Sequence, residues 1–199
     1  MIFRTVKDKN YMIVSNDTYM KDKEFEKGKE VDADIIMASD PDADRLGVAV
    51  KNDKGEFVLI NGNQIAILLL NYIMTRSREM GTLKGNEFIV KTIVTSELIK
   101  TIADKNDIKC YDCYTGFKWI AAVIRELEGK ERYIGGGEES YGFLVEDFVR
   151  DKDAVSAIPM MAEAAAWAKE NGMNFIKRQI LFLILIVIIL VFIVFIFTS

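Results

Sequence analysis

Histidine is absent from this 199-residue sequence, and cysteine and proline are scarce, with two residues of each. Without histidine, the serine–histidine and cysteine–histidine nucleophiles and the commonest zinc ligand sets are excluded. Two cysteines are too few for a disulfide framework, which favours a reducing compartment. The chemistry open to this chain therefore uses carboxylates, lysine, arginine and a metal ion, and phosphoryl transfer can be carried out with that set.

Positive charge is also in slight deficit, with 26 Lys and Arg against 30 Asp and Glu, giving a net charge of -4. Without a basic cluster, nucleic acid is not expected as the main partner. Half of the residues are apolar, which is enough for the core of one large or two small domains. No signal peptide precedes the body of the chain, so we expect it in the cytoplasm.

The most informative stretch is MASDPDADRLGVAV, residues 37–50. Its three carboxylates, Asp40, Asp42 and Asp44, stand at alternate positions, and Arg45 follows directly. Like charges so close together repel one another unless a cation neutralises them. Carboxylate oxygens suit Mg²⁺, so the loop predicts a magnesium site, with a solvated acidic turn as the alternative.

The flanks of this loop are apolar, at residues 33–38 and 46–50, so it joins two predicted buried strands. An EF-hand is excluded because its sixth and twelfth positions require Gly and Glu. Counted from Asp40, those positions hold Arg45 and Lys51.

Hydrophobic periodicity predicts an α/β fold in which helices pack against a sheet. The turn NDKG at 52–55 predicts a hairpin that pairs strand 46–50 with an antiparallel strand at 57–60. The charge-dense run 21–30 is interpreted as a solvated helix or loop. Further strands are predicted at 88–94, 108–113, 133–136 and 143–145, and helices around 65–73, 98–102, 119–127 and 154–169.

The polar, glycine-containing stretch 81–85 is the best domain boundary, which divides the body into 1–82 and 83–172. The remainder, 173–199, holds 18 consecutive apolar residues at 180–197 after Lys177 and Arg178. Such a run is long enough to span a bilayer as a tail anchor with the body on the cytoplasmic side. Because the run contains only Ile, Leu, Phe and Val, whose codons share their middle base, a frameshift product is the other hypothesis.

A second glycine-rich motif, GGGEESYG, occupies residues 135–142. Its glycines allow the backbone to approach a ligand closely, and Glu138 and Ser140 offer hydrogen-bonding groups for hydroxyls. It is not a dinucleotide fingerprint, because Ser140 stands where the third glycine is required. A hairpin that merely turns is the alternative. The pair Cys110 and Cys113 has no partner set for zinc and is interpreted as two strand thiols.

Three motifs, DPDADR at 40–45, GGGEESYG at 135–142 and VRDKDAV at 149–155, occur in the order found in one family. Together they resemble the α-D-phosphohexomutase superfamily of phosphoglucomutases and phosphomannomutases, over roughly residues 30–172. The resemblance implies mixed-sheet domains. Residues 1–82 would form the latter part of domain II, and 83–172 would form domain III.

In complete enzymes of this family, a phosphoserine exchanges a phosphoryl group with a hexose phosphate, which moves phosphate between C1 and C6. The resemblance implies that Asp40, Asp42 and Asp44 hold Mg²⁺. It also implies that Arg45 and Lys152 contact the transferring phosphate. From the residues alone, a salt bridge within the loop for Arg45 and a surface charge for Lys152 are the alternatives.

The resemblance further assigns sugar contacts to two loops, with glucose or mannose 1- or 6-phosphate as the expected ligand. These contacts are Thr115, Gly116, Lys118, Glu138 and Ser140. The family's serine loop and its last, phosphate-binding domain find no match here, so we expect the isolated chain to lack mutase activity. A membrane-tethered sugar-phosphate or Mg²⁺-binding module and an inert remnant are the alternative functions.

Overall fold

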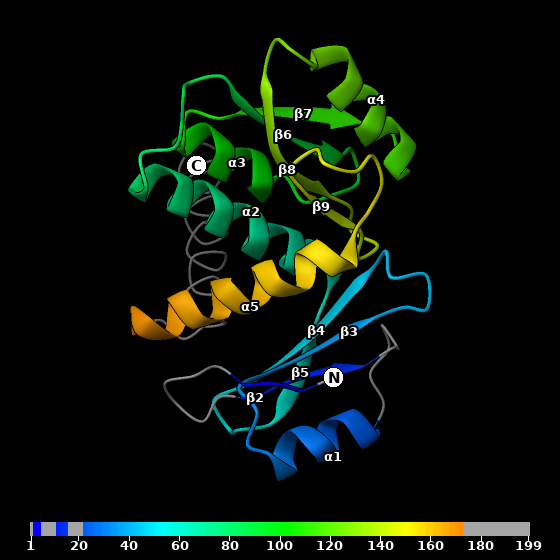
Figure 1. Cartoon of the computed structure of the whole chain (residues 1–199), viewed down its shortest axis with the longest axis vertical. Coiled ribbons are helices and arrows are strands. Elements are labelled where there is room, and N and C mark those ends of the chain that lie inside the picture. The colour runs from blue at the N-terminus through cyan, green and yellow to red at the C-terminus, as the bar shows by residue number, and fades with distance from the viewer. Residues whose placement is uncertain (1, 5–10, 16–21, 173–199) are drawn as a thin grey trace, which may run out of the picture. The chain divides into compact units, whose positions relative to one another are not determined.

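A computed structural model of the chain describes residues 2–4, 11–15 and 22–172 (Figure 1). Its contacts divide the chain into two units, Met1–Ala164 and Ala165–Ser199. In the second unit, the described residues are 165–172, which include the end of helix α5 (Ala154–Glu170). The apolar run at 180–197 lies outside the described residues. Across the ranges described, none of the helices combines the length and the hydrophobicity needed to cross a membrane.

The first sheet has the strand order β1-β2-β3-β4-β5. Only β2 and β3 pair in parallel, and the other neighbours are antiparallel. Asn52 sets the predicted turn, because its Oδ1 accepts the amides of Lys54 and Glu56 at 2.9 and 3.0 Å. The resulting pairing of β4 with β5 confirms the predicted hairpin. The bounds of the first five strands are Ile2–Arg4, Tyr11–Ser15, Ile35–Ser39, Leu46–Lys51 and Phe57–Ile60.

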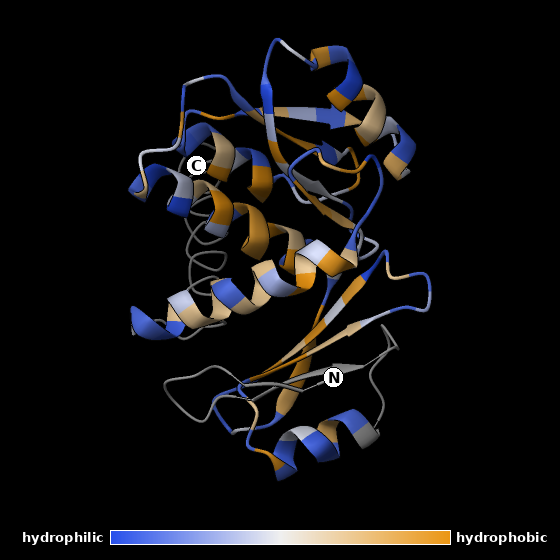
Figure 2. Cartoon of the chain, viewed as in Figure 1, coloured by the Kyte–Doolittle hydropathy of each residue, from blue (hydrophilic) through white to orange (hydrophobic). Residues whose placement is uncertain are grey.

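The core of the first sheet lies along β3 and β4, whose apolar runs are buried on both faces. Helix α1 (Asp22–Glu30) packs closely on it, since a side chain at Gly28 would come within 2.6 Å of Ile36 Cδ1. Figure 2 shows hydrophobic residues concentrated in β3, β4 and α2 (Gly62–Glu79), whereas α1 is mainly hydrophilic. Within the charged run, residues 22–30 therefore form a helix that is mainly hydrophilic.

The second sheet has the order β7-β6-β8-β9, with β9 antiparallel and the other neighbours parallel. This confirms the predicted mixed sheet. Helices α2 and α3 lie on one side of it and α4 on the other (Figure 1). Gly135 of β8, for example, lies against Leu70 and Ile73 of α2. The bounds of β6 to β9 are Glu87–Thr92, Lys109–Cys113, Arg132–Gly137 and Phe143–Val145, and those of α3 and α4 are Leu98–Lys105 and Phe117–Leu127.

One strand is shorter than its apolar pattern predicts. The prediction continued to residue 94, but β6 ends at Thr92, and Ile93 and Val94 are 57% and 53% exposed. The chain turns here because the Thr95 amide donates to the Thr92 carbonyl at 3.0 Å. The turn places Thr92 at the same edge as the carboxyl ends of β7 and β8, where parallel α/β sheets usually bind ligands.

Candidate functional site

The acidic loop between β3 and β4 is organised by the first of its three carboxylates. Asp40 Oδ1 accepts the backbone amides of Asp44 and Arg45 at 3.1 and 3.2 Å. The Asp40 carbonyl accepts the Ala43 amide at 3.0 Å, and Ala43 has a left-handed φ of 56°. These bonds close a tight turn, which fixes the backbone positions of the three aspartates.

The third carboxylate pairs with a lysine that lies two residues before α5. Asp44 Oδ2 lies 2.9 Å from Lys152 Nζ, while Asp44 Oδ1 is buried and has no hydrogen-bond partner among the described residues. Burial acts to raise the pKa of Asp44, but its bonds with Lys152 and Asp40 and the charges of Lys152 and Arg45 hold that pKa below the ordinary value. Burial acts to lower the pKa of Lys152, but Asp44 and Asp151 raise it. Both groups are therefore charged at neutral pH.

The Arg45 side chain is only loosely held by its own loop. Its Nε lies 3.9 Å from Asp40 Oδ2, at the limit of an ion pair, and the side chain is 52% exposed. An exposed pair at this distance contributes little to stability. The guanidinium is therefore accessible to an anion from solvent.

The backbone of the same residue joins the acidic loop to the GGGEESYG loop. Arg45 and Gly142 form an antiparallel bridge, and the Leu46 amide donates to the Tyr141 carbonyl at 3.0 Å. The glycine-rich loop is itself closed by the Glu138 amide, which donates to the Gly142 carbonyl at 2.8 Å. Two segments far apart in the sequence are thus held side by side by main-chain hydrogen bonds.

Glu138 lies in the interior of the site and is only 6% exposed. Its Oε1 accepts the Gly116 amide at 2.9 Å. Burial raises the pKa of Glu138 above the ordinary value, against the lowering effects of Gly116 and Lys152. A side chain at Gly142 would come within 2.5 Å of Lys152 Cδ and 3.1 Å of Glu138 Oε2. Lys152 and Glu138 therefore both lie against Gly142, and there is no space for a side chain at this position.

The start of α5 is bonded to the acidic loop and to β9, which directly follows the glycine-rich loop. The Asp153 amide donates to the Phe143 carbonyl at 2.9 Å, and the Ala154 amide donates to the Ala43 carbonyl at 3.0 Å. Asp153 caps the helix, since its carboxylate accepts the Val155 and Ser156 amides, both at 3.1 Å. This capped end holds Lys152 between the acidic loop and the glycine-rich loop.

The remaining predicted sugar contacts lie at the surface. Thr115, Lys118 and Ser140 are exposed, and Lys118 Nζ lies 5.3 Å from the centre of the Trp119 ring. In the described chain, none of the three is hydrogen-bonded or ion-paired to Asp44 or Lys152. Of the five predicted sugar contacts, the structure brings Gly116 and Glu138 together and leaves the other three open to solvent.

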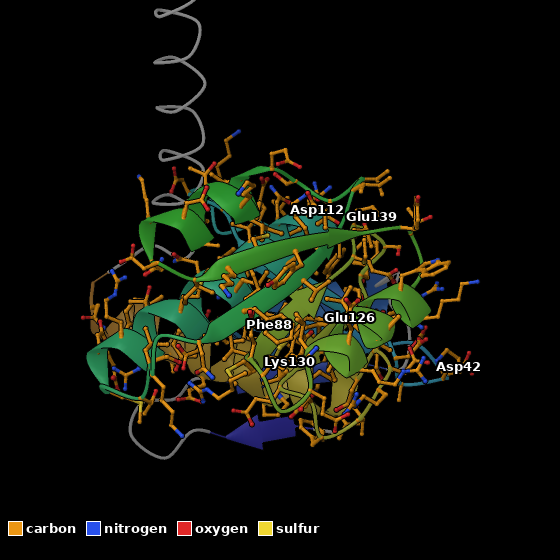
Figure 3. The ribbon with its side chains drawn as sticks, turned by 90° about the horizontal axis from the view of Figure 1, so that it is seen from above. Asp42, Phe88, Asp112, Glu126, Lys130 and Glu139 are labelled. Carbon is orange, nitrogen blue, oxygen red and sulfur yellow. The ribbon has the colours of Figure 1, made fainter. Side chains whose placement is uncertain are left out.

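The three aspartates do not form a gathered metal site. Among the described ranges, no group of three or more His, Cys, Asp or Glu side chains is arranged to hold a metal ion. Asp42 is exposed at the periphery (Figure 3), and Asp40 uses one oxygen for the loop amides. The unpartnered, buried Asp44 Oδ1 is the oxygen best suited to a cation. The donors thus fit Mg²⁺ in their chemistry, since all are hard oxygens.

Sequence reasoning missed Glu139, which lies between the two predicted residues Glu138 and Ser140. Glu139 Oε2 accepts the hydroxyls of Thr92 and Thr95 at 3.1 and 3.2 Å. It lies at the same edge of the second sheet as Asp112 (Figure 3). The second glutamate of the GGGEESYG motif was the available sign that this position matters. Its partner Thr92, however, lies 47 positions away in the sequence and cannot be inferred from a local pattern.

The two cysteines are free thiols on β7. Burial is the main cause that raises the pKa of Cys110 to about 12 and that of Cys113 to about 11. Both cysteines lie on a strand, as the interpretation as strand thiols predicts, and both thiols are partly buried.

Comparison with known proteins adds a family to this geometry. A family model described as phosphoglucomutase/phosphomannomutase, alpha/beta/alpha domain III, matches residues 61–179. A phosphoglucomutase from Staphylococcus epidermidis is 41% identical over 151 residues, which cover 76% of this chain and 27% of that protein. The chain therefore spans about a quarter of the length of this curated relative.

Solved structures show the same fold at low identity. A phosphoglucomutase/phosphomannomutase family protein from Burkholderia thailandensis aligns with a TM-score of 0.55 at 20% identity, covering 77% of this chain and 31% of that chain. An N-acetylphosphoglucosamine mutase from Aspergillus fumigatus aligns with a TM-score of 0.52 at 16% identity, covering 68% and 33%.

Proposed function

Because the chain belongs to the phosphoglucomutase/phosphomannomutase family, we propose that its site binds a hexose phosphate together with Mg²⁺. In this proposal the chain forms part of a mutase that moves a phosphoryl group between C1 and C6 of the sugar. One observation carries the proposal. The acidic loop, the glycine-rich loop and the start of α5 meet through main-chain bonds and the Asp44–Lys152 ion pair.

The proposed sugar-binding groups are at the carboxyl edge of the second sheet. Glu138 would accept hydrogen bonds from sugar hydroxyls, and the exposed Ser140 and Thr115 would supply further hydroxyl partners. Lys118 is exposed and is the cation nearest in sequence to Thr115 and Gly116. Gly116 leaves space for a ligand beside its backbone, since the nearest atom to the place of a side chain there is Trp119 Cδ1 at 4.0 Å.

The proposed phosphate-binding groups are Arg45 and Lys152. The exposed guanidinium of Arg45 offers planar donors that match phosphate oxygens. Lys152 supplies a point charge held at a fixed position by Asp44. Asp40, Asp42 and Asp44 are the residues that would hold Mg²⁺, and the bound ion would supply charge neutralisation at the phosphoryl group.

The ligand class rests on the chemistry of this chain. The Aspergillus fumigatus protein is described in complex with GlcNAc-6P and magnesium, and at 16% identity that likeness establishes the fold alone. Buried carboxylate acceptors beside accessible cations are nevertheless what a phosphorylated sugar requires. We further propose that the first sheet belongs to domain II and that α2 and the second sheet belong to domain III, because the domain III model matches from residue 61. We also propose that the body of the chain is cytoplasmic and that the isolated chain binds without turnover.

Isothermal titration of the 199-residue chain with glucose 1-phosphate in the presence of Mg²⁺ tests the proposal. We expect saturating heat at one site, with affinity lowered about tenfold or more in Arg45→Met and Lys152→Met, since bonds to charged groups are worth about 1.5–3 kcal/mol. Lys130→Met, an exposed lysine beyond α4, is the matched control. No heat from the wild-type chain at millimolar sugar phosphate would refute the proposal, and glucose 6-phosphate formation by the chain alone would refute the absence of turnover.

A further inference from the structure

Glu139 makes buried contacts that neither of its predicted neighbours shares. Its Oε2 accepts hydroxyls from Thr92 and Thr95, which are only 1% and 2% exposed. The two hydroxyl oxygens also lie 2.7 Å from each other. One carboxylate oxygen therefore completes a small buried polar cluster at the turn that follows β6.

The main chain of Glu139 is equally constrained. Its carbonyl oxygen lies so close to α2 that a side chain at Gly62 would come within 2.0 Å of it. The next residue of α2, Asn63, accepts the Ser96 amide through its Oδ1 at 2.8 Å. Glu139 is thus held against two elements, the first turn of α2 and the β6–α3 turn, which are themselves joined.

The β6–α3 turn is also held from its other side. Lys91 is fully buried, and its Nζ donates to the Thr95 carbonyl at 3.4 Å. The same ammonium group pairs with Glu97 at 2.7 Å and Asp112 at 2.8 Å. Figure 3 shows Asp112 and Glu139 at one edge of the second sheet. The threonines that bind Glu139 therefore belong to a turn with little freedom to move.

Because the glycine-rich loop is a tight turn, the position of Glu139 affects the positions of the residues next to it. The Glu138 amide bonds to the Gly142 carbonyl at 2.8 Å, and Tyr141 takes a left-handed φ of 74°. In so tight a turn, rotation at residue 139 displaces the residues on either side. The Glu138 side chain bonds to Gly116, whereas the Glu139 side chain bonds to the threonines. The two glutamates thus have different tasks.

We infer that Glu139 is a positioning residue, which sets the places of Glu138 and Ser140 for a sugar hydroxyl by binding Thr92 and Thr95. The role in sugar binding depends on the function proposed above. The role in ordering the loop does not, because it follows from contacts within the chain.

Two variants of Glu139 in the full chain separate positioning from simple stability. Glu139→Ala removes the acceptor, whereas Glu139→Gln retains a carbonyl oxygen for the same hydroxyls. Glu126→Ala removes an exposed carboxylate on α4 and is the matched control. Thr95→Val, which keeps the shape but lacks the hydroxyl, is a second variant in case Glu139→Ala unfolds. Each protein is measured by thermal unfolding, amide hydrogen exchange and titration with glucose 1-phosphate and Mg²⁺.

In Glu139→Ala and Thr95→Val, we expect the backbone amides of residues 138–142 to exchange at least about tenfold faster than in the wild type. Exchange of the amides in α4 should be unchanged. We expect sugar-phosphate affinity to fall by a similar factor in both, and Glu139→Gln to restore both quantities. Unchanged loop exchange in Glu139→Ala and Thr95→Val overturns the inference. Faster loop exchange with unchanged affinity also overturns it, since the residue would then be merely structural. If the wild type binds no sugar phosphate, the proposed function fails and the positioning role in sugar binding fails with it, while loop exchange still reports whether Glu139 orders the loop.

Discussion

Lys152 Nζ lies 2.9 Å from Asp44 Oδ2, so a residue two positions before α5 is ion-paired with a loop between two strands of the first sheet. The pair is mostly buried, with side-chain exposures of 18% and 26%. Removal of one partner from such a pair leaves the other charge without compensation, which costs more than the pair contributes. This relationship makes Lys152 a structural as well as a proposed phosphate-binding residue.

Lys152→Met is therefore expected to destabilise the fold by about 1–3 kcal/mol, because Asp44 loses its charged hydrogen bond. Urea unfolding at pH 7 measures the change. Adding Asp44→Asn to the Lys152→Met variant should lower the free energy of unfolding only slightly further, because Asp44 has already lost its lysine partner. Fully additive effects of the two substitutions would show that the ion pair is not energetically coupled.

Gly62→Ala is expected to be strongly destabilising, since its new side chain would lie 2.0 Å from the Glu139 carbonyl oxygen. A backbone atom cannot move aside as a flexible side chain can, so we expect a loss of about 3 kcal/mol or more. Ser77→Ala, in the same helix, should be neutral or slightly stabilising. Equal melting temperatures for the two variants would contradict the close approach of α2 to the glycine-rich loop.

Glu87 predicts a pH dependence of stability. Burial acts to raise the pKa of Glu87, but the amides of Lys84 and Gly85 and the side chain of Arg132 bring it below the ordinary value of 4.5. A carboxyl group whose pKa falls on folding stabilises the fold above its unfolded value, and that contribution is lost as pH falls through the folded value. The stability difference between wild type and Glu87→Gln should thus be largest at pH 7 and shrink below pH 4.5. Urea unfolding at pH 7, 5 and 3 tests this, and a constant difference would contradict it.

The raised pKa values of the two cysteines lead us to expect slow alkylation in the folded chain. With pKa values of about 12 for Cys110 and about 11 for Cys113, both thiols are protonated at pH 8, and the thiolate is the reactive form. We expect iodoacetamide to modify both at least about tenfold more slowly in buffer than in urea, as followed by mass spectrometry. Rapid modification of the folded chain would show that β7 opens readily.

Most helices and strands followed from local pattern. The turn NDKG produced the β4–β5 hairpin because Asn52 binds its own turn amides. Helix α2 begins after Asn61, because the Asn61 side chain accepts the Gln64 amide and the Gln64 side chain accepts the Asn61 amide. The end of β6 did not follow, since Ile93 and Val94 have the apolar character of a strand but lie in a turn formed by a threonine hydrogen bond.

The sequence by itself determined the types of residue available for chemistry, the hairpin that the NDKG turn closes between β4 and β5, and the order of the three motifs. Only the tertiary structure decided that Asp44 pairs with Lys152, that Glu138 accepts the Gly116 amide and that Glu139 binds two threonines. Local signals arise from neighbours along the chain, whose spacing is set by backbone geometry. Contacts between distant segments depend on how whole sheets and helices pack, and a pattern of single residues does not encode which of several carboxylates will meet a given cation or hydroxyl.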